Sequence, residues 1–360
     1  MPRALAFIAP LLIATATMLR AAPAPPVAGE ATRTTASPSA AIRNHGNPTI
    51  RIVIWYPATG ADHELDIGPP GHPVFLTGRV APGAPFADAA RHPLILLSHG
   101  FGGVARQLTW LGAPLARHGY VVAAVDHPGT NGRDGITPEG AYAPWERVGD
   151  LTAALDLVLA DPQLAPHIDA TRIGAAGFSL GGFTAALLAG ARTDFPHLAQ
   201  FCDSPQRDAI CNPQLEFPTD VHQQPAVLAR PEMRDITARR DNDFRDPRVK
   251  AAFLIAPALG QAIDQASLRR ISVPTEILLG DADPVAPPKT NGEFFARMIP
   301  GARLKLLPGV GHYDFLSECG AAGMTEAHAL CTDGAGTNRA LTHAATVAEA
   351  IVFFKEVFLF

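Results

Sequence analysis

The sequence predicts an α/β fold with a mostly parallel central sheet and helices on both faces of that sheet. Six short, continuously apolar runs indicate strands buried on both faces, as in parallel sheets: 93–97, 120–125, 172–177, 251–255, 276–279 and 303–307. Helical spacing of apolar residues follows at 151–159 and 347–358. A β-branched run at 50–56 predicts one more strand ahead of this series. The alternation of strands and helices is typical of an open sheet with crossover helices.

The composition is that of a globular protein. Of the 360 residues, 47 % are hydrophobic and 18 % are charged, which excludes wholesale disorder. The net charge of −5 comes without a block of like charges, so no nucleic-acid-binding surface is predicted. Nucleic acid is therefore not an expected partner.

The N-terminus has the pattern of a secretory signal peptide, predicted over 1–24. Arg3 precedes an apolar run over 4–19, and small residues follow Arg20, with cleavage after Ala16 or near 22–24. The run is shorter than the ~20 residues that a spanning helix needs, so no membrane span is expected after its removal. We therefore expect a secreted or periplasmic protein. Residues 25–48, rich in Ala, Pro, Thr and Ser, predict a flexible segment ahead of one domain over 49–360.

Four cysteines in an exported chain favour disulfides. We predict the pairs Cys202–Cys211 and Cys319–Cys331, because each closes a short loop. Zinc is the alternative, but neither pair has the spacing of a zinc site, and no metal is predicted.

Two segments depart from the alternation of strands and helices. Residues 57–92 are dense in Pro and Gly and predict loops with a hairpin. Residues 193–247 are polar and Pro-rich, and we interpret them as an insertion that forms a lid over the site. The alternative is a surface excursion without contact to the site.

Ser179 is the candidate nucleophile. It lies in a Gly-x-Ser-x-Gly motif between a predicted strand and the start of a helix at 183–190. The tight turn needs neighbours without side chains, which Gly177 and Gly181 supply. Such a turn lifts the hydroxyl to the carboxyl edge of the sheet and to a helix N-terminus, which favours developing negative charge.

His312 is the candidate base, because a serine hydroxyl needs a group that accepts its proton. It follows the last predicted strand in a glycine-flanked loop. Asp283 is the preferred acid and Asp281 the alternative, since both follow the strand at 276–279. The order serine, acid, histidine is that of one class of serine hydrolases.

Two backbone N–H groups are predicted to form an oxyanion hole. One belongs to Leu180, next to the nucleophile, and the other to Phe101, in the glycine-rich loop after the strand at 93–97. Four aromatic residues are candidates for lining an acyl or aromatic pocket: Phe101, Phe178, Trp55 and Trp145.

A dinucleotide-binding interpretation competes for the same loop. Residues 100–105 read Gly-x-Gly-x-x-Ala, and Asp126 ends the next predicted strand. This alternative predicts an oxidoreductase. It is disfavoured because a strand precedes the motif and because Ser179, Asp283 and His312 would have no role. We expect no cofactor.

At this point the chain resembles the α/β-hydrolase superfamily, and within it the exported dienelactone-hydrolase-like proteins related to platelet-activating-factor acetylhydrolases. The resemblance begins near residue 49 and rests on these segments: Val53–Pro57, Leu97–Gly103, Val125–Gly129, Gly177–Gly182, Gly280–Pro284 and Gly311–Leu316. Cys319 and Cys331 also fit that branch. The resemblance implies an α/β-hydrolase fold with Ser179, Asp283 and His312 as the triad.

Two residues depart from those families. Dienelactone hydrolases have a cysteine where this chain has Ser179, and the acetylhydrolases commonly have a histidine where it has Phe178. Neither substrate is therefore carried over. We predict a serine carboxylic-ester hydrolase for small or lipid-like esters, with an amidase or peptidase that uses the same triad as the alternative.

Overall fold

The computed structural model describes residues 26–37, 39–215 and 220–359. The predicted signal peptide, 1–24, lies outside these residues.

Within the described residues, one sheet holds eleven strands. They are β1 (Val27–Ala36), β2 (Thr49–Ala58), β3 (His63–Ile67), β4 (Phe75–Pro82), β5 (His92–Ser98), β6 (Val121–Asp126), β9 (Ile168–Phe178), β10 (Val249–Ile255), β11 (Thr275–Gly280), β12 (Arg303–Leu307) and β13 (Glu318–Cys319). Their spatial order is β12-β11-β10-β9-β5-β6-β2-β1-β4-β13, with β3 paired to β4. Pairing is parallel from β12 to β6, whereas β2 is antiparallel to β6 and β1 is antiparallel to β2. The predicted mostly parallel sheet is confirmed.

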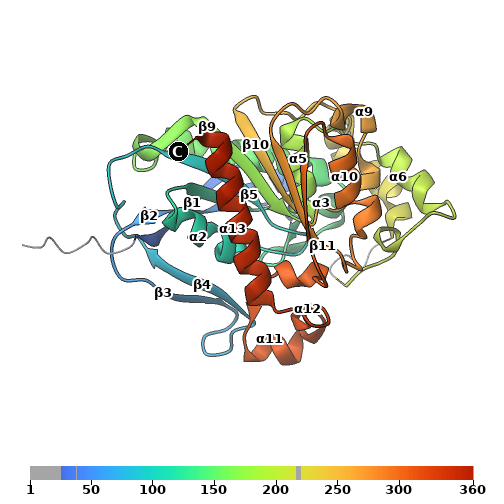
Figure 1. Ribbon diagram of the computed structural model, residues 1–360. Coiled ribbons are helices and arrows are strands. Elements are labelled where there is room, and N and C mark those ends of the chain that lie inside the picture. Colours follow the sequence, from blue (N-terminus) through green and yellow to red (C-terminus); the bar gives the residue numbers. More distant parts are fainter. Residues whose placement is uncertain (1–25, 38, 216–219, 360) are drawn as a thin grey trace, which may run out of the picture.

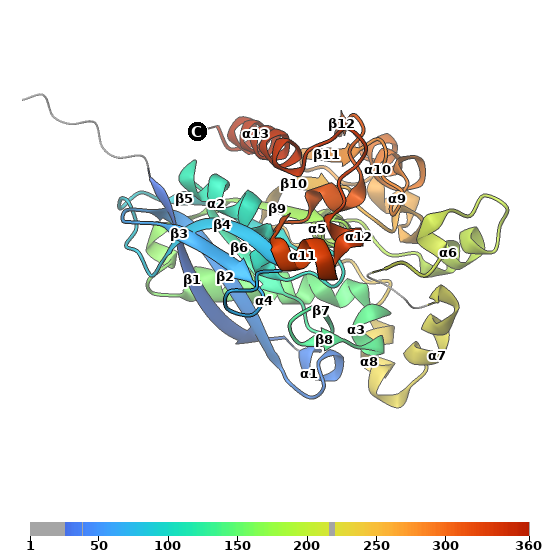
Figure 2. The same cartoon turned by 90° about the horizontal axis from the view of Figure 1, so that it is seen from below.

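Helices cover both faces of this sheet (Figures 1 and 2). The α-helices are α1 (Ala40–Arg43), α2 (Thr109–Arg117), α3 (Pro138–Ala141), α4 (Arg147–Ala160), α5 (Leu180–Ala189), α6 (Phe195–Cys202), α7 (Gln224–Leu228), α8 (Arg234–Ala238), α9 (Gln265–Leu268), α10 (Gly292–Met298), α11 (Ala321–Glu326), α12 (His328–Cys331) and α13 (Arg339–Phe358). Helices α2 and α13 pack on one face of the sheet, and α4 and α5 pack on the other. The predicted two-sided cover is therefore confirmed.

The apolar strands behave as a parallel sheet requires, except at its edge. Every residue of β5, β6 and β11 is buried. Strand β12 has only one neighbour, so Leu304 and Leu306 are exposed. The prediction that the run 303–307 is buried on both faces is therefore wrong, because an edge strand is covered less completely than the central strands.

The prediction of a flexible segment over 25–48 is wrong for its described residues. Strand β1 pairs with β2 along its whole length. Small residues are needed there, because a Cβ on Gly29 would lie 2.4 Å from the Tyr56 ring. Arg43, at the end of α1, is fully buried. The neighbouring strand supplies the bulky side chains that β1 lacks, so the composition of the segment alone was misleading.

The two irregular segments both carry structure. Strands β3 and β4 form the expected antiparallel hairpin within 57–92. The described residues of the segment 193–247 include the short helices α6, α7 and α8. In Figure 2, α6 and α7 lie at the right of the molecule, and α7 contacts α3.

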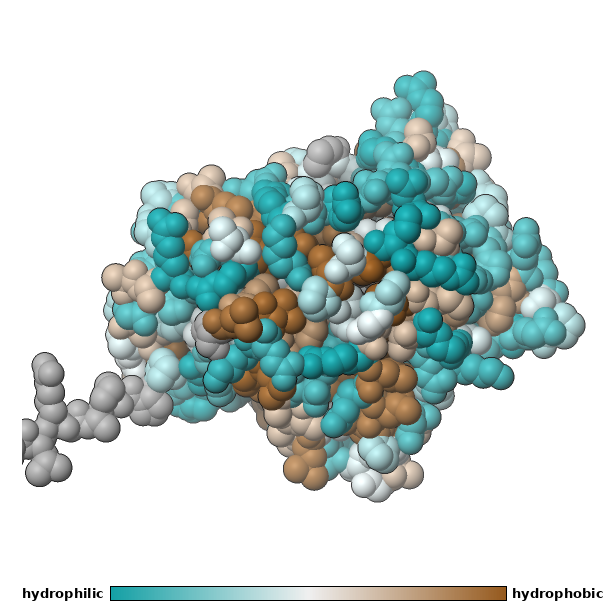
Figure 3. All heavy atoms as spheres, turned by 45° about the horizontal axis from the view of Figure 1, so that its top comes forward, coloured by the Kyte–Doolittle hydropathy of each residue, from teal (hydrophilic) through white to brown (hydrophobic). Residues whose placement is uncertain are grey.

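The described surface is mixed in polarity. On the face in Figure 3, apolar side chains form separate groups among hydrophilic ones. In the part of the chain described here, no helix combines the length and the apolar character that crossing a membrane requires.

Candidate active site

Ser179 occupies the tight turn between β9 and α5. Its backbone has φ 55° and ψ −119°, a conformation that residues with a side chain rarely adopt. Its N–H donates to the Ile255 carbonyl oxygen at 2.9 Å. A Cβ on Gly177 would lie 2.2 Å from the Gly181 oxygen, and one on Gly181 would lie 1.9 Å from the Ser98 oxygen. Both glycines are therefore required by close backbone approach, as the motif predicted.

The structure brings Ser179, His312 and Asp283 into one hydrogen-bonded chain. His312 Nε2 lies 2.9 Å from Ser179 Oγ, and His312 Nδ1 lies 2.6 Å from Asp283 Oδ2. All three residues are buried, with Ser179 the most accessible at 7 % exposure. With Nδ1 protonated and donating to the carboxylate, Nε2 is the nitrogen that can accept the serine proton.

Asp283 lies beside the histidine, and Asp281 does not. The Oδ1 atom of Asp283 accepts hydrogen bonds from the N–H groups of Val285 and Ala286, which fixes the carboxylate. The Asp281 carboxylate instead accepts the Gly309 N–H at 2.7 Å and caps a turn. The preference for Asp283 over Asp281 therefore agrees with the geometry.

The loop that carries His312 is held by a carboxylate that the sequence did not single out. Asp314 accepts the N–H groups of Gly311 and Gly334 and the hydroxyl of Thr337. These bonds tie the His312 turn to the segment ahead of α13. The sequence gives little indication of this role, because an aspartate two residues after the histidine cannot be distinguished there from any other loop aspartate.

The predicted oxyanion residues both border the space at Ser179. Leu180 begins α5 directly after the serine, and Phe101 lies in the loop after β5. Both line a cavity together with Ser179. A Cβ built on Gly100 would lie 3.4 Å from the Ser179 Cβ, so this loop passes close to the hydroxyl. The donor roles of Leu180 and Phe101 stay predictions.

Two cavities flank Ser179. The first, here called the insertion pocket, is lined by Phe101, Ala141, Tyr142, Pro144, Ser179, Leu180, Phe195, Leu198, Ile210, Gln214, Gln224, Ala258, Leu259 and Val285. The second, here called the histidine-side pocket, is lined by His99, Gly100, Phe101, Gly102, Gly103, Gln107, Leu108, Ile136, Phe178, Ser179, Leu215, His312, Tyr313, Phe315, Leu316 and Leu330. Segment 193–247 thus contributes to the wall of the first cavity, and whether it moves as a lid stays a prediction.

Two of the candidate pocket residues are core residues instead. Trp55 is fully buried and donates its Nε1–H to Glu30, while its ring packs against Gly112 of α2. Trp145 is fully buried and donates to the Ile236 carbonyl oxygen at 3.1 Å. Phe178 lines the histidine-side pocket, with its ring centroid 4.9 Å from that of His312. The sequence shows where aromatic residues occur but not which side of a strand or helix borders the site.

A second Ser–His–Asp chain lies in the interior, and sequence reasoning missed it. His127 Nε2 lies 2.9 Å from Ser98 Oγ, and His127 Nδ1 lies 3.1 Å from Asp150 Oδ2. All three side chains are fully buried. Asp150 also pairs with the buried Arg43 through bonds of 2.6 and 3.0 Å. We call Ser98, His127 and Asp150 the interior triplet.

Arg147 connects the interior triplet to the loop that carries Phe101. It is fully buried and donates to Ser98 Oγ and to the His99 carbonyl oxygen. Burial lowers the pKa of Arg147 to about 9. Burial, with Arg147 and Arg43 nearby, lowers the pKa of His127 well below its usual range. His127 is therefore neutral at neutral pH.

Both predicted disulfide pairings are present. Cys202–Cys211 links α6 to the turn at Ala209–Cys211, beside the insertion pocket. Cys319–Cys331 links β13 to α12, beside the histidine-side pocket. The described residues hold no cluster of three or more His, Cys, Asp or Glu side chains that could bind a metal.

The residues of the dinucleotide alternative are engaged elsewhere. Asp126 accepts the Ala105 N–H at 2.7 Å and pairs with Arg51 at 3.2 Å. Strand β5, which precedes the glycine-rich loop, lies in the middle of the sheet between β9 and β6. This aspartate therefore stabilises its own loop.

Comparison with known proteins finds sequence similarity over part of the chain and structural similarity over most of it. Cutinase est2 of Thermobifida alba is 36 % identical over 102 residues, which are 28 % of this chain and 31 % of the cutinase. Cutinase 2 of Thermobifida cellulosilytica is 32 % identical over 102 residues, 28 % of this chain and 35 % of that one. The matched part is thus about a third of each cutinase.

The structure of a ferulic acid esterase from Streptomyces cinnamoneus superposes with a TM-score of 0.58 and 22 % identity, covering 94 % of this chain and 91 % of that one. This likeness is one of fold. The model of the alpha/beta hydrolase family matches residues 94–322, which include Ser179, Asp283 and His312. The chain therefore belongs to the alpha/beta hydrolase family.

Proposed function

We propose that this protein is a serine ester hydrolase that acts through an acyl-enzyme. The observation that carries the proposal is the relay of 2.9 and 2.6 Å through His312, which ends at a serine hydroxyl bordering two cavities. A serine in such a relay can lose its proton as it attacks, which an isolated serine cannot do at neutral pH.

In the first half of the reaction, Ser179 Oγ attacks the ester carbonyl while His312 Nε2 accepts the proton. The resulting oxyanion is stabilised by the N–H groups of Leu180 and Phe101. His312 then donates the proton to the alkoxy oxygen, the C–O bond breaks and the alcohol leaves. Asp283 holds the imidazole in the required tautomer and stabilises its charged form.

In the second half, water takes the place of the alcohol. His312 accepts a proton from that water as it attacks the acyl carbonyl. The tetrahedral intermediate collapses, Ser179 regains its proton and the carboxylic acid leaves. The residues named supply every proton transfer, so the cycle needs no cofactor.

Esters are favoured over amides by the relatives. The partial matches are named cutinases and the structural neighbour is named a ferulic acid esterase. Those names describe enzymes that act on esters. The triad chemistry itself also serves amide hydrolysis, so the choice between the two bonds is decided by measurement.

We also infer that the protein works outside the reducing cytoplasm. Two disulfides in a chain without free cysteines among its described residues are typical of an exported protein. The signal-peptide pattern at 1–24 supports the same conclusion.

The test compares p-nitrophenyl esters with matching p-nitroanilides and identifies the nucleophile by labelling. We expect turnover of the esters, and a fluorophosphonate adduct on the peptide that contains Ser179. Label on another residue, or turnover of the anilides but not the esters, would overturn the proposal.

A further inference from the structure

The two cavities at Ser179 have different relations to His312. The histidine-side pocket is lined by His312 and Tyr313, whereas the insertion pocket is lined by Ser179 and Leu180 but not by His312. An ester bound at Ser179 extends from its carbonyl carbon in two directions, towards the acyl chain and towards the alcohol. The two cavities offer one space for each part.

The proton transfer decides which part enters which cavity. His312 Nε2 must deliver its proton to the departing alkoxy oxygen, so that oxygen lies within hydrogen-bond reach of the imidazole. The alcohol therefore extends into the histidine-side pocket. The acyl chain, on the other side of the carbonyl carbon, extends into the insertion pocket.

The insertion pocket has the chemistry of a hydrocarbon site. None of the described residues that line it is charged. Two of its polar side chains are tied down: Gln214 Nε2 donates to the Val285 carbonyl oxygen and Gln224 Nε2 to that of Tyr142. What faces the cavity is otherwise largely aliphatic and aromatic, with Leu198 and Ile210 among it. A charged acyl group would lose its hydration there without gaining a partner.

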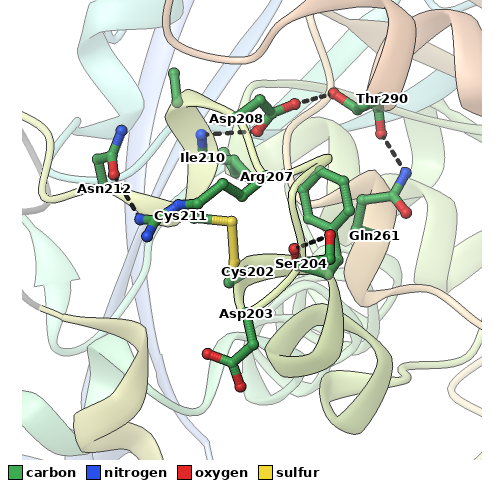
Figure 4. Close-up of a disulfide and its surroundings, with 12 residues drawn as sticks. Cys202, Asp203, Ser204, Arg207, Asp208, Ile210, Cys211, Asn212, Gln261 and Thr290 are labelled. Carbon is green, nitrogen blue, oxygen red and sulfur yellow. Dashed lines mark hydrogen bonds between the residues drawn. A yellow bond between two sulfur atoms is a disulfide. The ribbon is translucent and has the colours of Figure 1, made fainter.

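Leu198 and Ile210 both come from the insertion. Figure 4 shows the disulfide and the hydrogen bonds around Ile210. The Cys202–Cys211 disulfide joins the helix that carries Leu198 to the turn that carries Ile210. Asp208 caps that turn by accepting the Ile210 N–H and also accepts the hydroxyl of Thr290, ahead of α10. The disulfide therefore joins the two parts of this wall, and the Asp208–Thr290 hydrogen bond attaches it to the body of the domain.

We infer that the insertion pocket binds an uncharged hydrocarbon acyl chain, and that Leu198 and Ile210 determine which chain lengths are accepted. The inference rests on the proposed ester hydrolysis by Ser179. Each methylene buried in such a pocket is worth up to about four-fold in kcat/KM. The rise should stop at the length where the chain meets this wall.

The experiment measures kcat/KM for p-nitrophenyl esters from acetate to dodecanoate in the wild type and in Leu198→Trp and Ile210→Trp. We expect the ratio of decanoate to acetate to fall at least ten-fold in both variants, because the indole fills the pocket. Leu198→Ala, which enlarges the pocket, should move the optimum to longer chains. Thermal unfolding of each variant identifies any that fails to fold.

Two matched leucine substitutions complete the design. Leu341 lies on the exposed side of α13, with 71 % of the residue accessible. Leu341→Trp should therefore leave the ratio of decanoate to acetate unchanged. Leu330→Trp, in the histidine-side pocket, should change the preference among alcohols of acetate esters but not the acyl ratio. If Leu330→Trp shifts the acyl ratio and Leu198→Trp the alcohol preference, the assignment of the cavities is reversed and the inference is wrong.

The disulfides offer an independent test. Replacing both Cys202 and Cys211 by Ser should release the wall and lower the ratio of decanoate to acetate, whereas replacing Cys319 and Cys331 should not. An unchanged ratio in the first double variant and in both Trp variants would overturn the inference. A wild type that turns over no ester of the series would instead refute the proposed function.

Discussion

The candidate active site and the interior triplet have the same Ser–His–Asp connectivity, yet their surroundings differ in access and in charge. The histidine-to-serine distance is 2.9 Å in both, between His312 and Ser179 and between His127 and Ser98. Ser179 lies in a strained turn beside two cavities, whereas Ser98 ends a regular strand and is fully buried.

The charges around the two histidines differ as well. Asp283 is held by neutral N–H groups, whereas Asp150 is paired with Arg43 and its triplet contacts Arg147. Burial, and after it the charges of Arg147 and Arg43, lower the pKa of His127 and keep it neutral. Three side chains in hydrogen-bond order are therefore not sufficient for an active site. The serine must also meet the substrate, and the histidine must be able to carry a positive charge.

The sharpest test of this contrast replaces the two serines separately. We expect Ser179→Ala to lower kcat on p-nitrophenyl acetate about 10⁶-fold, as when a triad acts as one unit. Ser98→Ala should stay within about ten-fold of the wild type, because its hydroxyl meets no substrate. It should instead lower the free energy of unfolding in urea by about 1–3 kcal/mol through lost buried hydrogen bonds. A folded Ser98→Ala as inactive as Ser179→Ala would remove the distinction.

The two carboxylates should separate activity from stability. Asp283→Asn is expected to lower kcat about 10⁴-fold, because the amide favours the wrong imidazole tautomer. Asp150→Asn should cost about 3–5 kcal/mol of unfolding free energy, because it leaves Arg43 buried without its counter-charge. Steady-state kinetics and urea unfolding of both variants check this. Equal loss of stability in the two would contradict it.

Arg147 tests whether the interior region supports the site. We expect Arg147→Met to lower kcat on acetate about ten-fold with KM little changed, because the His99 carbonyl loses its donor and the loop that carries Phe101 relaxes. A reduced kcat with unchanged KM is what a loosened oxyanion loop predicts. An unchanged kcat in the folded variant would show that the interior region serves stability alone.

The smallest effect concerns acid stability. The pKa of His127 is lowered by burial first and then by Arg147 and Arg43, and that of His99 is lowered mainly by burial. The unfolded chain binds these protons below pH ~6.5 and the folded chain does not. Stability is therefore fully present above that pH and falls below it, by up to about 1.4 kcal/mol per pH unit for each histidine.

Urea unfolding at pH 7.5, 6.0 and 5.0 measures this slope. In His127→Asn the unfolding free energy should depend less steeply on pH, because about one proton fewer is taken up on unfolding. The same slope in the variant would mean that His127 is protonated in the folded protein.

Much of the fold and the candidate triad could be predicted because both leave local traces in the sequence. Buried strands are short apolar runs, and the turn at Ser179 needs Gly177 and Gly181. The order of the triad follows from the order of the strands. These features depend on residues close together in the chain.

What could not be predicted depends on residues far apart. The strand at Val27–Ala36 can lack bulky side chains because β2 supplies them. The insertion pocket is built from the insertion and from five other segments of the chain. Arg43 and Asp150 are 107 residues apart, and the residues next to each of them in the sequence do not indicate that the two form an ion pair. Trp55 and Trp145 were misassigned because their orientation is fixed only by tertiary packing.

Because the backbone at Ser179 has a positive φ, selection for thermal stability and selection for catalytic activity favour different residues at this position. A glycine would occupy this turn without the strain of about 1–3 kcal/mol that a side chain incurs at such angles. A library screened for thermal tolerance alone would therefore enrich Ser179→Gly and discard the hydroxyl. Screens that aim to stabilise this enzyme need a catalytic readout at every round, because the proposed nucleophile is also a residue whose loss would stabilise the fold.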